Sequence, residues 1–378
     1  MSELKNANNR RGDFRLQLLT TASVLTLASF VSGTGARADD DADHPIVWVE
    51  LGGQFERLNS PEAILAPPFF DHASSVDQAT MTDAQQQPSF SIGGNGKISF
   101  APEGTNWVFS AAVSYGRSNS AKHLHHETPG LPQEYFTVGG NPFLHYSPAV
   151  RVFGDAQTTS QETHVIADFR AGKDVGLGMF GGGSSVFSAG VRFAQFTSKA
   201  DTTLHARPRD KVTHKYSPGA YSVSTIARHT YTATLHAERN THAIGPSLSW
   251  DASVPVAGSD NGMAVAFNWG ANAAFLFGRQ RVKGRHQTTG RYIKGLASAN
   301  QVSSYAPGPH PIDRAHTVTI PSVGGFAGLS FRYADAKLDL GYRADFFFNA
   351  VDGGIDIRKS ETVGFYGPFA SISVGLGG

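Results

Sequence analysis

Long runs of alternating apolar and polar residues are the feature that most constrains the fold of this chain. In residues 337–349 one face carries Leu338, Leu340, Tyr342, Ala344, Phe346 and Phe348, and the other carries Lys337, Asp339, Gly341, Arg343 and Asp345. Successive side chains of a β-strand point to opposite faces, so this period of two predicts a strand. Such runs exceed the roughly five or six residues of a soluble strand and match the about 9–11 of a tilted membrane-spanning one.

The same alternation recurs along the chain. It marks ten segments, at about 46–58, 88–100, 106–117, 161–173, 185–197, 240–252, 262–278, 320–333, 336–349 and 364–376. An even number suits a barrel with both termini on one side, and closure lets every backbone polar group pair where lipid offers no partner. We predict an all-β fold, a closed antiparallel transmembrane β-barrel of about ten strands. Eight or twelve strands are alternatives, since residues 231–238 also alternate and extend a strand above the bilayer.

The connections between these segments alternate in length. Short ones lie at 101–105, 174–184, 254–261 and 334–335, and long ones at 59–87, 118–160, 198–239, 279–319 and 350–363. Tight turns on one side and long loops on the other are typical of an outer-membrane barrel. We therefore expect short periplasmic turns and long extracellular loops.

The start of the chain has the pattern of a secretory signal peptide. Lys5, Arg10 and Arg15 form a basic start, residues 18–31 are largely apolar, and Ala36 to Ala38 form an A-x-A cleavage site. We expect residues 1–38 to be removed and residues 39–378 to form one barrel domain in the cell outer membrane. The absence of Cys excludes disulfides and thiolate metal sites, and a hydrophobic content of 40% with a net charge of +1 excludes disorder.

Three short segments carry a family resemblance. They are residues 190–196 (GVRFAQF), 341–345 (GYRAD) and 366–372 (YGPFASI). These pieces resemble strands of the Legionella-type major outer membrane protein-like family of Gram-negative β-barrels. The resemblance implies an outer-membrane location and a porin-like architecture, and it transfers no catalytic or binding residue.

The predicted inward faces carry charges of both signs in equal number. They are Glu50, Glu56, Lys97, Asp168, Arg170, Arg192, Asp251, Arg332, Lys337, Asp339, Arg343 and Asp345. A selective pore favours one sign, whereas a closed interior needs a partner for each buried ion. We expect a luminal charge network, with the lining of a narrow pore as the next alternative and catalysis as the last.

A basic cluster follows the seventh segment. Arg279, Arg281, Lys283, Arg285, Arg291 and Lys294 occur with no acid between the first and the last. The aromatic residues Phe275 and Phe277 precede the cluster, which suggests a position just above the membrane interface. Arginine forks bind phosphate bidentately, so we predict contact with lipopolysaccharide; solvated loop charge is the alternative, and export argues against nucleic acid. The other expected partners are outer-membrane lipid and the barrel-insertion machinery.

Histidine is concentrated in the predicted outer loops. His123, His125 and His126, with His145, could hold a metal, but polar loop residues are the simpler interpretation and we predict neither metal nor cofactor.

An enzyme is the remaining alternative. A hydrolase with a loop-rim active site would use residues such as Asp155, His164 and His242, but the sequence has no G-x-S-x-G, H-E-x-x-H or P-loop motif. We expect a non-enzymatic barrel, either a narrow channel or a plugged structural barrel, with a surface adhesin as a further alternative.

Overall fold

The structure is a computed structural model that describes residues 46–59, 90–128, 134–138, 141–145, 152–175, 183–207, 209–216, 221–258, 263–294, 301–306, 308–333, 335–354 and 357–376. All of them belong to one compact unit, Pro45–Gly377. The predicted signal peptide, residues 1–38, lies outside the described residues.

The described residues form fourteen strands. They are β1 (Ile46–Asn59), β2 (Phe90–Ala101), β3 (Trp107–Thr128), β4 (Glu134–Val138), β5 (Asn141–His145), β6 (Val152–Asp174), β7 (Ser184–Arg207), β8 (Arg209–Tyr216), β9 (Tyr221–Gly258), β10 (Ala264–Lys294), β11 (Gln301–Tyr305), β12 (His310–Tyr333), β13 (Ala336–Asp352) and β14 (Ser360–Leu376). No helix among them is long and apolar enough to cross a bilayer.

Ten of these strands close into an antiparallel barrel. The sheet runs β10-β12-β13-β14-β1-β2-β3-β6-β7-β9, and pairing of β9 with β10 completes the ring. Val47 pairs with Leu376, so the first and last strands begin and end at the same rim. The predicted fold, its ten segments and its closure are confirmed.

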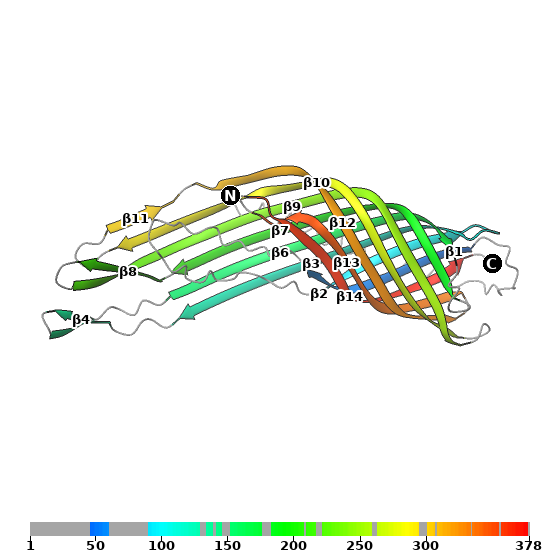
Figure 1. The fold of residues 1–378 in the computed structure, drawn as a ribbon, viewed down its shortest axis with the longest axis horizontal. Helices are drawn as coiled ribbons and strands as arrows, with labels where there is room; N and C mark the ends of the chain where they lie inside the picture. Colours follow the sequence, from blue (N-terminus) through cyan, green and yellow to red (C-terminus); the bar gives the residue numbers. More distant parts are fainter. Residues whose placement is uncertain are drawn as a thin grey trace, which may run out of the picture. The chain divides into compact units, whose positions relative to one another are not determined.

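The strands are much longer on one side of the barrel than the alternation predicted. In Figure 1, β6, β7, β9 and β10 run far beyond the ends of β13 and β14. The expected long loops at 118–160, 198–239 and 279–319 were therefore wrong over much of their length. Cross-strand pairing continues there, for example between Lys283 and Glu238. Inward side chains such as Val282 and Leu235 remain buried, and the charged side chains of Lys283 and Arg285 face outward. The proposed extension at residues 231–238 is indeed part of β9.

The outer surface of the barrel is apolar at the level of the shorter strands. Ile92, Phe169, Ile244 and Phe277 are exposed there, at 77%, 62%, 56% and 55% of their surface. Their inward neighbours on the same strands include Gly93 and Asp168, which are buried and half-buried. The barrel thus has an apolar exterior and a largely polar interior, the reverse of a water-soluble domain.

Candidate functional site

The barrel interior encloses a polar cavity of about 310 Å³. Side chains from all ten barrel strands line it, because each strand presents every second residue to the lumen. Eleven of the twelve predicted luminal charges lie in its wall. The exception is Arg332, which is exposed near the short turn after β12, with its guanidinium 5.6 Å from the ring of Trp48.

One ionic cluster crosses the lumen from β6 to β12. Arg192 donates from Nε and Nη2 to the two carboxylate oxygens of Asp168, at 2.8 and 3.2 Å, and Arg170 lies 2.9 Å from the same carboxylate. Arg192 also donates to Asn272 Oδ1 at 2.9 Å and to Ser322 Oγ at 3.3 Å. Since Arg192 is only 3% exposed, these bonds supply the partners that a buried guanidinium requires.

A second group of polar contacts lies on β13. Lys337 and Asp339 form an ion pair at 3.1 Å, and Asn268 donates to Asp339 at 2.9 Å. Asp345 accepts a hydrogen bond from Asn272 at 3.1 Å. Asn272 therefore links this group to the Arg192 cluster.

Glu56 and His164 form a buried pair beside the cavity. They are 2% and 4% exposed, and His164 Nε2 lies 3.7 Å from Glu56 Oε2. Two glycines make room for them: a Cβ on Gly116 would lie 2.0 Å from Glu56 Oε1, and one on Gly93 would lie 2.8 Å from Glu56 Oε2. Larger residues at these positions would displace the pair.

An apolar layer closes the lumen on the long-strand side of the cavity. Leu276, Ile320 and Phe347 are fully buried, and Phe196 and Phe365 pack against Phe347 with ring centroids 4.9 and 6.1 Å apart. These residues face inward on β7, β10, β12, β13 and β14. The interior is therefore polar in one part and apolar in the next.

The tip of the β13–β14 hairpin bends into the barrel mouth above this layer. Pairing between the two strands shifts register between Phe347 and Val351, and Asn349 takes a φ of 59°, a conformation that Asn tolerates better than most residues. Gln280 of β10 donates to the Asn349 carbonyl. As a result Ala350, Val351 and Asp352 are all buried, although alternate residues of a regular strand would face outward.

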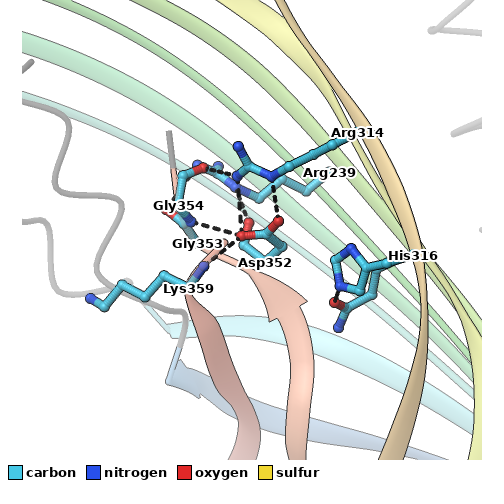
Figure 2. A network of polar contacts seen from close by, with 8 residues as sticks. Arg239, Arg314, His316, Asp352, Gly353, Gly354 and Lys359 are labelled. Atoms are coloured by element: carbon cyan, nitrogen blue, oxygen red, sulfur yellow. Dashed lines mark hydrogen bonds and ion pairs between the residues drawn. The ribbon is translucent and has the colours of Figure 1, made fainter. Parts of the chain in front are cut away.

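A carboxylate holds the tip in place (Figure 2). Arg314 of β12 donates from Nε to Asp352 Oδ2 at 2.7 Å and from Nη2 to Asp352 Oδ1 at 3.2 Å. The backbone N–H groups of Gly354 and Lys359 donate to the same Oδ1, both at 3.0 Å. On the other side, Arg239 of β9 donates to the Asp352 carbonyl at 2.8 Å. We call Arg239, Arg314 and Asp352 the tip latch.

The pKa values of Asp352 and Arg239 differ from their ordinary values. Burial alone would raise the pKa of Asp352, but the hydrogen bonds from Arg314, Lys359 and Gly354 outweigh it, so the pKa lies below the usual 3.8. Burial lowers the pKa of Arg239, which the carboxylates of Glu162, Asp352 and Glu361 partly offset. The Asp352 carboxylate is therefore ionised at neutral pH.

Neither the apolar layer nor the tip latch was predicted from the sequence. Arg239 fell at the end of the expected long loop 198–239, whereas the residue is buried in β9. A signal for the layer was present in Phe346-Phe347-Phe348, where Phe347 interrupts the polar face. Asp352 lies in the predicted connection 350–363, and no local pattern distinguishes it.

The predicted lipopolysaccharide contacts lie on strand β10 and not in a loop. Arg279, Arg281, Lys283 and Arg285 are exposed on the outward face, immediately beyond Phe275 and Phe277. Arg281 lies 3.4 Å from Asp313 of β12. The backbones of Arg291 and Lys294 pair with those of Ser304 and Gln301 of β11.

The residues considered for hydrolysis do not meet. Asp155 and His242 face outward on β6 and β9, while His164 is buried inside the barrel. Asp155 instead contacts His123. Among the side chains that the structure describes, no three His, Asp or Glu converge as metal ligands.

Comparisons with known proteins give no close relative. No family model matches the sequence and no curated protein matches it, so the resemblance to the Legionella-type family stays a prediction. Among solved structures, a TodX deltaS2S3 mutant monoaromatic hydrocarbon channel is 9% identical, with 88% of this chain and 90% of that chain covered and a TM-score of 0.21.

Two further solved structures are similar at the same level. The toluene transporter TodX of P. putida is 8% identical over 90% of both chains, with a TM-score of 0.18. The siderophore receptor PirA of Pseudomonas aeruginosa is 7% identical over 91% of this chain and 81% of its own, with a TM-score of 0.12. At TM-scores this low we base no inference on these neighbours, and the function is argued from the chain itself.

Proposed function

We propose that the protein is a non-enzymatic outer-membrane β-barrel that conducts small polar solutes through a narrow lumen, and that the structure represents its closed state. The observation that carries the proposal is the polar cavity. It lies inside a barrel whose outer surface is apolar, and the apolar layer and the hairpin tip seal it. The seal consists of the Arg314–Asp352 ion pair, hydrogen bonds and packing, all of them non-covalent, so it can open without unfolding the barrel. The porin-like family resemblance points the same way.

The tip latch provides the test of conduction. Wild-type protein in planar bilayers should give rare, discrete conductance steps with weak ion preference, because the cavity wall carries acids and bases in similar number. Asp352→Asn removes the charge that Arg314 binds, so the open fraction should rise. Arg358→Gln is the matched control, since Arg358 is exposed on the same tip and makes no latch contact. Silence of both wild type and Asp352→Asn would favour a plugged structural barrel.

A second proposal concerns the outward face of β10, where the basic residues follow the apolar surface directly. Lipopolysaccharide phosphates would lie at this level, and each screened basic contact at an anionic surface contributes on the order of 1 kcal/mol. Replacing Arg281, Lys283 and Arg285 with Gln should therefore weaken lipopolysaccharide binding in a salt-dependent way. The inward residues of β10 are untouched, so the barrel should stay folded. Equal binding by parent and variant at low and high salt would refute the contact.

A further inference from the structure

Some charges in the cavity wall have no ion-pair partner among the residues that the structure describes. Asp168, Asp339 and Asp345 all have partners within hydrogen-bond or ion-pair distance. Asp251 of β9 and Arg343 of β13 line the same cavity, and neither makes an ion pair with a described residue. Both side chains are half-buried, so their charged groups stay open to the cavity, and two such groups of opposite charge can bind a ligand that carries the complementary charges.

The ring of Phe326 lies between the two charges. In the pairing register, Arg343 stands opposite Phe326, Phe326 opposite Gly270, and Gly270 opposite Asp251. A Cβ on Gly270 would lie 2.5 Å from Asp251 Oδ1 and 2.4 Å from Phe326 Cε1, so the carboxylate and the ring edge meet above this glycine. Gly270 therefore allows Asp251 to reach the edge of the ring.

Arg343 lies against two aromatic rings. Its guanidinium carbon lies 5.7 Å from the centroid of Phe326 and 5.5 Å from that of Phe369. Cation–π contacts orient a guanidinium but leave its N–H donors unsatisfied, and that planar fork matches a carboxylate. The wall thus presents an acceptor, an apolar ring and a donor fork in one row.

From this row we infer that the cavity binds a small zwitterion that carries both an ammonium and a carboxylate group, with an amino acid as the simplest case. The ammonium would donate to Asp251, the carboxylate would accept from Arg343, and the carbon chain between them would pack on Phe326. A cavity of about 310 Å³ is large enough for such a molecule. This inference deepens the proposed conduction and rests on it for how the ligand reaches the cavity.

The test is calorimetric titration of the full chain in detergent with glycine, β-alanine, γ-aminobutyrate and ε-aminocaproate. At least one should bind, and butyrate and butylamine should bind about tenfold more weakly because each lacks one charged contact. Asp251→Asn should weaken binding of the zwitterion but not of butyrate, and Arg343→Gln should weaken both. Arg332→Gln, which changes a charge of the barrel that lies outside the cavity wall, should leave binding unchanged.

The outcomes separate this inference from the conduction proposal. Asp352→Asn is titrated beside the wild type, so that a closed barrel mouth does not hide the site. Arg343→Lys replaces Arg343→Gln as the variant if the latter fails to fold. Absence of binding by every zwitterion, or equal binding by the parent and both cavity variants, overturns the inference. Conductance without binding rejects the zwitterion site alone, whereas binding without conductance rejects the channel.

Discussion

Along strand β13 the inward face changes its chemistry within a few residues. Lys337, Asp339 and Arg343 face a polar cavity, but Phe347 is fully buried in an apolar layer, and Asp352 is held under Arg314 and Arg239. Lys337 to Phe347 follow one alternation in this strand, and the register shift after Phe347 ends it before Asp352. Period two therefore determines which side chains face the lumen, whereas the strands across the lumen determine what fills it.

The largest effect on stability is expected in the apolar layer. Phe347→Ala should lower the free energy of unfolding by about 3–5 kcal/mol, because the packing of a fully buried ring is lost and a cavity remains. Guanidinium unfolding in detergent measures this change. Phe348→Ala on the outward face, where the ring is 40% exposed, is the control and should cost less. Equal losses would mean that the layer packs no better than the outer surface.

The latch should contribute less to stability than the layer. Asp352→Asn keeps the shape of the side chain but removes the charge, so the hydrogen bonds from Arg314 weaken and the loss should be about 2 kcal/mol. We expect the hairpin tip to become sensitive to protease while the barrel strands stay protected. A variant that is cleaved no faster than wild type would show that packing alone holds the tip.

The latch should also respond to acid. The pKa of Asp352 lies below its usual 3.8, so the stabilisation by its charge is complete above that value and is lost as pH falls through the lowered pKa. Cleavage of the tip by an acid-active protease should therefore increase below about pH 3.8 in wild type. Asp352→Asn should show no such step. A step of the same size in both proteins would assign the titration to another group.

Most of the barrel could be predicted from local sequence, and the seal could not. The ten strands, their order and the inward placement of Asp168 and Arg192 follow from alternation alone. The latch joins Arg239, Arg314 and Asp352, which are distant in sequence and meet because the tip bends across the mouth. That bend depends on the register shift after Phe347 and on the left-handed Asn349, neither of which a periodic pattern reports.

The cavity wall should be the region least sensitive to substitution. Lys337 pairs with Asp339 at 3.1 Å, but its side chain is 34% exposed, so water and cavity polarity screen the pair. Lys337→Gln should therefore change the free energy of unfolding by less than about 1 kcal/mol. A double-mutant cycle with Asp339→Asn isolates the coupling between the two groups, which should be equally small. A coupling as large as the Phe347→Ala loss would show that the cavity is as tightly integrated as the layer above it, and the contrast between the two parts of the lumen would fail.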